Sequence, residues 1–335
     1  MDIKTTDVIV VGAGPIGLFS VFEAGMLGMK CHVFDSLEFI GGQCSALYPE
    51  KPIYDIAGFP SIKAQDLIDN LEKQAAPFKP EYHLEEQIVS VEKEGNDFIV
   101  KSDKGTVCKA KAIFISGGCG SFGPNRPPLP GVEAYEAGGT VKYMVNKIEN
   151  YRGKKVVIAG GGDSALDWVI NLEPVAEKIY LVHRRDKFRA QDELERQMRQ
   201  LVSDNKIEYV VPYQLDSLKG DNGVLSHVVV KNLNGETRDL EADILLPFYG
   251  LAMELGPIAE WGLNIDKKHI QVDPSTMQTN IEGIYALGDI ADYANKKKLI
   301  VVGFSECAFA AHNAYNRVFP DKALHFEYST SKGVG

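Results

Sequence analysis

Two stretches of the sequence carry the residue pattern that phosphate-binding turns require. The first starts with a β-branched run at residues 7–11, which predicts a buried parallel strand, and continues directly into G-A-G-P-I-G. In such a turn Gly12 permits the tight bend, Gly14 lets backbone N–H groups approach a pyrophosphate, and Gly17 lets helix and strand pack closely. Asp35 follows the next predicted strand, 23 residues after Gly12, where it can accept hydrogen bonds from a ribose diol. The pattern predicts a dinucleotide site with a free ribose, the alternative being a glycine-rich turn in another α/β fold.

The second stretch has the same arrangement but the opposite charge at its end. Residues 155–159 predict a strand, and a G-x-G-x-x-A turn beginning at Gly160 follows it. The same offset of 23 residues leads from Gly160 to His183, after which two arginines follow. Arginine offers a 2′-phosphate planar, permanently charged donors, so this turn predicts an NADP(H) site, unless the basic residues are only a solvated strand end. The residues expected to contact NADP(H) are Gly160, Gly162, Ser164, His183, Arg184, Arg185 and Arg189.

Length and charge limit the classes of protein to which these turns can belong. The 335 residues suggest about two domains, and the net charge of −10 argues against nucleic-acid binding, which needs a basic footprint. No apolar run reaches the roughly 18 residues that span a bilayer. Asp2 and Asp7 precede the first apolar segment, where a signal peptide would be basic. We therefore expect a cytoplasmic protein without nucleic-acid or membrane partners.

Further elements can be placed around the two turns. Alternating runs within 84–116 predict a small β-meander, and the Gly- and Pro-rich loop at 117–131 predicts a domain boundary. Residues 192–200 predict a charged surface helix, and a second meander is expected within 205–242. Near the end of the chain, 279–292 predicts a strand that leads into Gly288 and Asp289, followed by a helical stretch.

The cysteines are too widely spaced for a recognisable redox or metal motif. They stand at positions 31, 44, 108, 119 and 307, and the smallest spacing is eleven residues. Since no C-x-x-C pair is present, the sequence predicts no zinc pattern and no metal site. In a reducing compartment these residues are expected to be buried thiols.

The two turns, a Gly-Gly-Gln loop at 41–43 and a Y-A-x-G-D stretch at 285–289 resemble the two-dinucleotide-binding-domain flavoproteins over nearly the whole chain. This resemblance implies an α/β fold of two Rossmann-like dinucleotide-binding domains with a three-layer ββα architecture like that of thioredoxin reductase. It implies FAD in a discontinuous domain of residues 1–121 and 249–335, and NADPH in an inserted domain of residues 122–248. Hydride would pass from the nicotinamide to flavin N5.

The chain departs from the disulfide reductases of this superfamily, which need two cysteines beside the flavin. Low-molecular-weight thioredoxin reductases carry C-x-x-C just before the second nucleotide strand, and this segment has no cysteine here. In the glutathione-reductase branch the pair follows Gly-Gly, but here Cys44 stands alone and Pro49 occupies the partner's position. A disulfide needs Cα atoms within about 7 Å of each other. Pairing of Cys44 with Cys119 in space stays open as an alternative.

Two longer motifs, G-G-Q-C-x-x-L-Y-P-E-K-x-I-Y-D-I and H-R-R-D-x-F-R-A, resemble those of the thioredoxin-reductase-like ferredoxin/flavodoxin–NADP(+) reductases. The resemblance implies an FAD-dependent homodimer that exchanges single electrons with an iron–sulfur or flavin protein, either ferredoxin or flavodoxin. The flavin and nicotinamide carry the chemistry, so no catalytic side chain is expected. Tyr48 and Tyr328 are expected to stack on the isoalloxazine, unless they are core aromatics. The implied FAD contacts are Asp35, Gln43, Tyr48, Ile88, Phe122, Asp289 and Thr330.

The net negative charge of the chain should slow its encounter with a ferredoxin, because ferredoxins are usually acidic too. Lys296, Lys297 and Lys298 follow Asp289 closely and are expected to dock the partner, the alternative being a solvated loop. Other functions stay open: a thioredoxin-like disulfide reductase, an NADPH oxidase or peroxidase, or a non-catalytic flavoprotein that senses NADPH. A flavin monooxygenase is disfavoured because no oxygenase-type motif lies between the two nucleotide turns.

Overall fold

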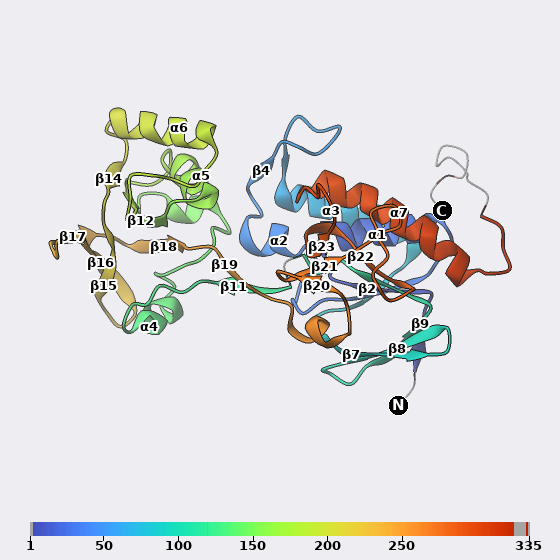
Figure 1. Ribbon diagram of the computed structural model, residues 1–335. Helices are drawn as coiled ribbons and strands as arrows, with labels where there is room; N and C mark the ends of the chain where they lie inside the picture. The colour runs from blue at the N-terminus through green and yellow to red at the C-terminus, as the bar shows by residue number, and fades with distance from the viewer. Residues whose placement is uncertain (1–2, 119, 325–332, 334–335) are drawn as a thin grey trace. The chain divides into compact units, whose positions relative to one another are not determined.

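Two parallel sheets organise the chain, one in each of the units into which it divides (Figure 1). The computed structural model describes residues 3–118, 120–324 and 333. One unit contains Met1–Phe122 and Met253–Gly335, and the other contains Gly123–Ala252. Domain boundaries after residues 121 and 248 were expected, one and four residues earlier than these limits. Where the chain passes between the units, β11 (Ser121–Pro124) pairs with β19 (Leu251–Glu254).

The first unit is centred on a five-stranded parallel sheet with the order β22-β10-β2-β3-β6. Its central strand is completely buried from Val8 to Val10, which explains the uninterrupted β-branched run, because layers of structure cover both faces of the sheet. The strands are β2 (Val8–Val11), β3 (Cys31–Phe34), β6 (Glu81–His83), β10 (Ala112–Ile115) and β22 (Ile284–Ala286).

Alternate residues of the central strand face different layers. Val8 and Val10 pack in one core with the alanines of α7, whereas Ile9 packs in another with Phe98 and Val100 of the β-meander. Figure 1 shows α1, α3 and α7 together on one side of the sheet and β7, β8 and β9 on the other. This is the expected three-layer ββα architecture. Its outer layers are α1 (Pro15–Met26), α3 (Ala64–Ala75) and α7 (Ile300–Val318), and β1 (Lys4–Thr5), β7 (Ile88–Glu94), β8 (Asp97–Ser102) and β9 (Val107–Ala110).

The β-meander expected within residues 84–116 is confirmed, but residues 112–115 are not part of it. β9 ends the meander, and β10 enters the parallel sheet between β2 and β22. Lys111 separates the two strands, and its backbone N–H donates to the carbonyl oxygen of Asp7 at 3.1 Å. Cys108 and Ala110 of β9 pack in the core between the layers together with Ile113 and Ile115 of β10.

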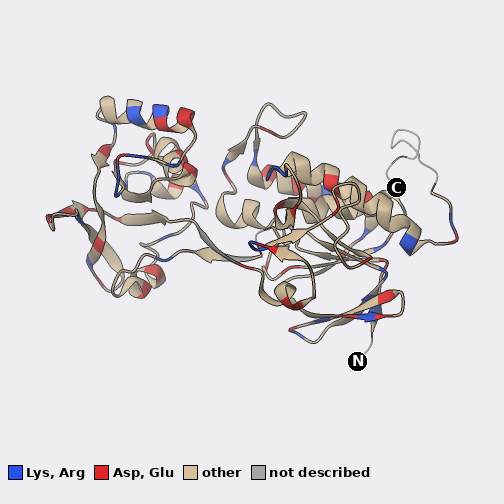
Figure 2. Cartoon of the chain, viewed as in Figure 1, with Lys and Arg blue, Asp and Glu red and all other residues tan. Residues whose placement is uncertain are grey.

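The second unit has a four-stranded parallel sheet in the order β14-β13-β12-β18 and a three-stranded antiparallel sheet. The predicted charged helix is α6, and Figure 2 shows charged residues of both signs on it. Arg196 and Glu193 of this helix form an ion pair at 2.6 Å. The parallel strands are β12 (Lys155–Gly160), β13 (Lys178–Val182), β14 (Glu208–Val210) and β18 (Ile244–Phe248). The other elements are β15 (Gln214–Asp221), β16 (Val224–Lys231), β17 (Thr237–Glu241), α4 (Val132–Ala137), α5 (Asp163–Leu172) and α6 (Asp192–Ser203).

Among the described residues, no helix has the length and apolar character that crossing a membrane would require.

Short elements complete the fold. The short helices and strands are α2 (Gln43–Leu47), β4 (Pro52–Ile53), β5 (Ile62–Lys63), β20 (Ile265–Asp266), β21 (His269–Gln271), β23 (Ala291–Asp292), and the 3₁₀ helices η1 (Ala76–Phe78), η2 (Ile148–Tyr151), η3 (Gly256–Glu260) and η4 (Gly288–Ile290).

Candidate cofactor-binding sites

The first glycine-rich turn links β2 to α1. A different steric constraint explains why glycine stands at each of its three positions. Gly12 has a φ of +106°, and a Cβ atom there would lie 2.6 Å from the carbonyl oxygen of Ser116. A Cβ on Gly17 would lie 1.8 Å from the carbonyl oxygen of Gly12, so only glycine lets the helix approach the turn. Gly14 caps the N-terminus of α1, and a Cβ there would meet no protein atom closer than 4.0 Å. Only an occupant of the adjoining groove would therefore require glycine at position 14.

Asp35 follows β3 and is held against the same turn. Its Oδ2 accepts the backbone N–H of Ala13 at 2.6 Å, and its Oδ1 accepts that of Leu37 at 2.9 Å. Burial raises the pKa of Asp35, while these two hydrogen bonds lower it. A carboxylate oxygen offers two lone pairs, so each oxygen keeps acceptor capacity toward a ligand.

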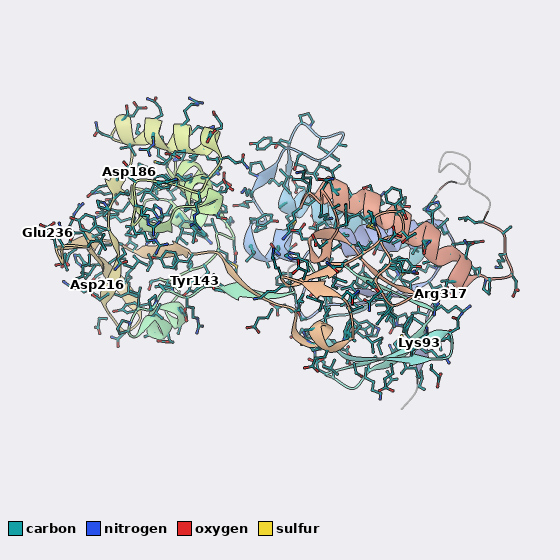
Figure 3. All side chains as sticks on the ribbon, in the orientation of Figure 1. Lys93, Tyr143, Asp186, Asp216, Glu236 and Arg317 are labelled. Carbon is teal, nitrogen blue, oxygen red and sulfur yellow. The ribbon has the colours of Figure 1, made fainter. Side chains whose placement is uncertain are left out.

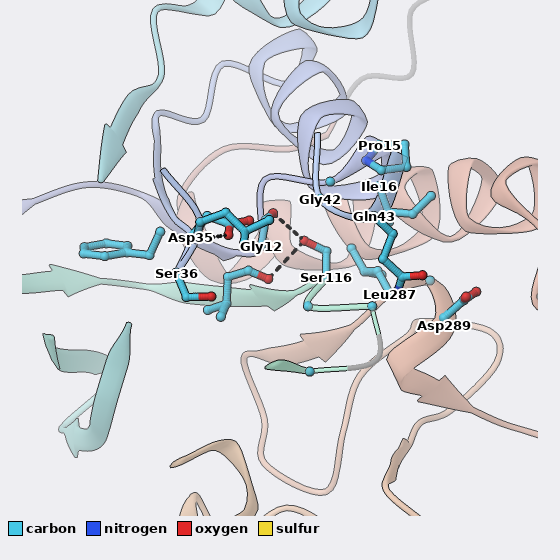
Figure 4. Close-up of a pocket in the computed structure, with 18 of the residues that line it drawn as sticks. Gly12, Pro15, Ile16, Asp35, Ser36, Gly42, Gln43, Ser116, Leu287 and Asp289 are labelled. Carbon is cyan, nitrogen blue, oxygen red and sulfur yellow. Dashed lines mark hydrogen bonds between the residues drawn. The ribbon is translucent and has the colours of Figure 1, made fainter. Parts of the chain in front are cut away.

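A groove in the first unit brings the turn together with residues from distant parts of the chain. It encloses about 1260 Å³ of space, part of which is open to solvent. Figure 4 shows Asp35 on one side of the groove, Gln43 and Asp289 on the other, and Gly12 with Ser116 between them. Of the expected FAD contacts, those that line the groove are Gly12, Gly14, Asp35, Gln43, Tyr48, Ile88 and Asp289. The side chain of Phe122, and Tyr328 and Thr330 altogether, lie outside the described residues.

The Gly41-Gly42 loop approaches the nucleotide turn through its backbone. Gly41 donates its N–H to the carbonyl oxygen of Ala13 at 2.9 Å. Gly42 has a φ of +56°, and a Cβ atom there would lie 3.2 Å from the Cα of Gly14. The loop therefore forms one wall of the groove and presents α2, with Gln43 at its first position, toward the groove interior.

A buried ion pair supports the turn that carries Asp289. The side chains of Glu306 on α7 and Lys296 are 1% and 5% exposed, and they contact each other. Glu306 also accepts the backbone N–H of Gly288 at 2.7 Å and the hydroxyl hydrogen of Tyr293 at 2.6 Å. Burial and this carboxylate raise the pKa of Tyr293. The network fixes the backbone one residue before Asp289.

The sequence analysis did not predict this network, and the network corrects the prediction for Lys296. Lys296 was expected to lie in an exposed docking loop with Lys297 and Lys298, but its ammonium group is buried against Glu306. Lys297 and Lys298 are exposed. A single acidic residue within the apolar stretch 300–311 was the available signal, because such a residue on a buried helix face needs a partner.

In the second unit, the glycine-rich turn links β12 to α5 and packs against His183. A Cβ on Gly160 would lie 2.6 Å from the carbonyl oxygen of Phe248, and one on Gly161 would lie 2.2 Å from His183 Cε1. Gly161, for which the sequence pattern specified no role, thus makes room for the imidazole ring of His183. Burial lowers the pKa of His183, and the nearby Arg184 and Arg185 lower it further.

The basic residues after β13 remain available on the surface. Arg184, Arg185 and Arg189 are exposed, and no salt bridge to them is found among the described residues. Asp186, labelled in Figure 3, is instead held by Arg199 at 3.1 Å and by the hydroxyl of Tyr209. The backbone N–H of Arg189 donates to the carbonyl oxygen of Gly161 at 2.7 Å, which places this residue beside the turn. The local acid is thus engaged elsewhere, and the guanidinium groups can meet an anion.

The described cysteines have the properties of structural thiols. Cys31, Cys44, Cys108 and Cys307 are free and buried, and Cys119 lies outside the described residues. Burial raises the pKa of Cys44 to about 11, although a hydrogen bond to Tyr48 opposes this shift. Since the thiolate is the reactive form, a protonated Cys44 is a poor nucleophile at neutral pH.

Comparisons with known proteins agree with this geometry. The family model described as pyridine nucleotide-disulphide oxidoreductase matches residues 6–314. Proteins named ferredoxin–NADP reductase from Rickettsia canadensis and Rickettsia felis are both 58% identical, over 327 and 328 residues, covering 98% of this chain and 97% and 98% of theirs. Among solved structures, Lactococcus lactis thioredoxin reductase has a TM-score of 0.78 at 25% identity, with 94% of this chain and 99% of that chain covered. The chain therefore belongs to the pyridine nucleotide-disulphide oxidoreductase family.

Proposed function

We infer that this protein is an FAD-dependent ferredoxin–NADP(+) reductase. The observation that carries the inference is the pair of nucleotide turns in separate units, one followed by a buried carboxylate and the other by exposed guanidinium groups. These turns suit a dinucleotide with a free ribose and one with a 2′-phosphate, respectively. The relatives named ferredoxin–NADP reductase support the choice of acceptor.

We assign FAD to the groove of the first unit. Asp35 would accept from the adenosine ribose, and the backbone around Gly14 at the N-terminus of α1 would receive the pyrophosphate. Gln43, Tyr48 and Asp289 line the part of the groove that would hold the flavin portion, with Tyr48 as a stacking partner. Ile88 would contact the adenosine end, because the nearby Glu86 N–H donates to the carbonyl oxygen of Asp35 at 2.9 Å. FAD held by these residues would supply the hydride-accepting and single-electron chemistry. The protein positions the cofactors and excludes water, and no side chain is assigned a proton transfer.

We assign NADPH to the second unit. Gly160, Gly162 and Ser164 would hold the pyrophosphate at the start of α5, where Gly162 is the N-cap residue. Arg184 and Arg185 would bind the 2′-phosphate, and Arg189 lies beside the turn as a further donor. His183 would hold the edge of the nucleotide pocket through its packing on Gly161.

The properties of the thiols favour a separate redox carrier over a disulfide as the electron acceptor. A dithiol relay needs a second sulfur next to Cys44, and the described cysteines provide none. We expect the double variant Cys44→Ala/Cys119→Ala to reduce ferredoxin with NADPH at the wild-type rate, because no electron passes through sulfur. The measurement is anaerobic stopped-flow reduction of ferredoxin, with flavodoxin and oxygen as alternative acceptors.

A matched control is Cys307→Ala, which removes a buried thiol on α7 outside the groove. If only the Cys44/Cys119 variant loses activity, the protein is a thiol-dependent reductase instead. Faster turnover with oxygen than with either carrier protein would favour the NADPH oxidase alternative.

We propose that Lys297 and Lys298, without Lys296, help to dock the acidic partner. The exposed pair directly precedes Leu299 and Ile300, which line the groove, so its charge lies near the expected flavin. Replacing both lysines by glutamate should lower the ferredoxin on-rate at low ionic strength, and the difference should shrink as salt screens the charges.

The control for this variant is Lys93→Glu/Lys101→Glu, which changes the same charge on the β-meander; Lys93 is labelled in Figure 3. Flavin reduction by NADPH should be unaffected in both variants. Equal effects of the two double substitutions would show that only net charge matters, and would contradict a docking role for the loop.

We further propose a cytoplasmic homodimer, as the family resemblance implies. The free, buried thiols suit a reducing compartment. Light scattering of the purified protein would determine the number of subunits, and fractionation of cells would determine the location.

A further inference from the structure

A cluster of metal-ligating side chains lies in the first unit, between the parallel sheet and the β-meander. His32 is on β3, and Glu81 and His83 are on β6. The two strands are parallel neighbours in which His32 pairs with Glu81 and Phe34 with His83. Because alternate residues of a strand face the same side, these side chains share one face of the sheet.

The distances within the cluster are close to those of a tetrahedral metal site, with Glu81 Oε2 3.4 Å from His32 Nε2. The three side chains offer ligand atoms that all lie within 4.8 Å of one another. His32 Nδ1 lies 3.0 Å from His83 Nε2, which lies 3.7 Å from Glu81 Oε1. Tetrahedral zinc, with bonds of about 2.0–2.3 Å, holds neighbouring ligand atoms about 3.3–3.7 Å apart. The widest of these separations must shorten by up to about 1 Å for the three side chains to enclose an ion.

A fourth side chain that could bind a metal lies in the facing layer. Cys108 is on β9 of the β-meander, is fully buried, and places its Sγ 3.9 Å from His32 Nδ1. Its Sγ is not among the ligand atoms that lie within 4.8 Å of one another, so the side chain would have to move toward His83 and Glu81 on binding. We propose that His32, His83, Glu81 and the thiolate of Cys108 bind one Zn²⁺ ion. On binding, the thiol proton of Cys108 is released to solvent, and the neutral imidazoles donate through His32 Nδ1 and His83 Nε2.

The surroundings of the cluster suit a structural site. Phe34 stacks on His83 with ring centroids 4.2 Å apart and an interplanar angle of 11°, which fixes the imidazole. Glu86 places a carboxylate oxygen 3.6 Å from His83 Nδ1, on the opposite side of the ring from the ligand atom. Such an outer carboxylate orients zinc-bound histidines in other proteins. Glu81 also contacts Lys4, whose side chain is 43% exposed and can move into solvent when the metal arrives.

Zinc bound here would join the parallel sheet to the β-meander in the first unit. β3 and β6 belong to the parallel sheet and β9 to the β-meander, so the bonds would cross between the layers. The ion would act as a clamp and not as a catalyst, because four protein ligands leave no open position for substrate.

Titration of the full-length holoprotein with Zn²⁺ and with Co²⁺ tests the site, using protein produced without a histidine tag and treated with a chelator. We expect one equivalent of Zn²⁺ to remain after gel filtration, and the thermal transition to rise with Zn²⁺ concentration. The Co²⁺ difference spectrum should show intense d–d bands typical of a tetrahedral site, at wavelengths where oxidised flavin does not absorb. His32→Gln and His83→Gln should each lower the Zn²⁺ affinity at least about 100-fold.

Three further variants separate the metal site from a merely structural cluster. Cys108→Ser should keep the d–d bands but lose the sulfur-to-cobalt charge-transfer band. Lys4→Ala should raise the Zn²⁺ affinity, because Glu81 then loses a competing partner. His227→Gln, in the second unit, should change nothing. Binding of less than one equivalent, or binding that survives loss of both His32 and His83, would overturn the proposal, and an unchanged cobalt spectrum in Cys108→Ser would overturn the fourth ligand.

Discussion

Replacing Arg184 and Arg185 together by alanine is expected to lower kcat/KM for NADPH about 100-fold or more while leaving that for NADH nearly unchanged, since each charge-assisted contact contributes about 1.5–3 kcal/mol. Both side chains are exposed, and no salt bridge to either is found in the described parts of the chain. Their removal therefore leaves no buried charge and should not disturb the fold. The measurement is the rate of flavin bleaching by each nucleotide under anaerobic conditions.

Two further variants make this test specific. Arg152→Ala/Arg196→Ala removes the same charge from the second unit, at exposed arginines that pair with the glutamate three residues earlier, and should leave the nucleotide preference intact. Lysine at 184 and 185 should restore only part of the preference, because an ammonium group cannot bind phosphate in a bidentate way. An equal loss with NADPH and NADH would contradict recognition of the 2′-phosphate.

Glu306→Ala is expected to lower the free energy of unfolding by about 3–5 kcal/mol, because it leaves the buried ammonium of Lys296 without its counter-charge. The substitution also removes the acceptor of the Gly288 N–H. The backbone beside Asp289 should then loosen, so FAD should be released at lower denaturant concentration. Denaturant titration followed by flavin fluorescence measures both effects.

The double variant Glu306→Ala/Lys296→Ala should be less destabilised than Glu306→Ala alone, because no unpaired charge is then buried. As a control, Glu92→Ala breaks an exposed pair with Lys101 and should cost about 1 kcal/mol or less. If Glu306→Ala is no more destabilising than Glu92→Ala, the buried pair does not support the Asp289 turn.

The glycine-rich turns were predictable because their steric requirements arise between near neighbours in the sequence. The carbonyl oxygen of Gly12 is five residues from the Cα atom of Gly17, and the contact between them follows from one strand–turn–helix geometry. The offset of 23 residues from the first glycine of each turn to the end of the next strand follows from the same strand–turn–helix geometry. This offset placed Asp35 at the first turn, where it accepts the Ala13 N–H.

Packing between distant segments was not predictable in the same way. Lys296 belongs to a run of three lysines that is typical of a solvated loop, and only the path of α7 brings Glu306 to it. The imidazole of His183 likewise packs against Gly161. The spacing of 23 residues placed His183 near the second turn, but neither spacing nor periodicity indicated the packing of its ring on Gly161 or the pairing of Lys296 with Glu306.

The sequence by itself determined the two nucleotide turns, the charge that follows each of them, and the absence of a C-x-x-C motif, since all three depend on residue type and short spacing. Only the tertiary structure decided that Lys296 is internal and that His32 and His83 meet across 51 residues. The physical reason is that strand order and layer packing, which many weak contacts set together, place these side chains. Local patterns encode the elements, but the arrangement of the elements creates the sites.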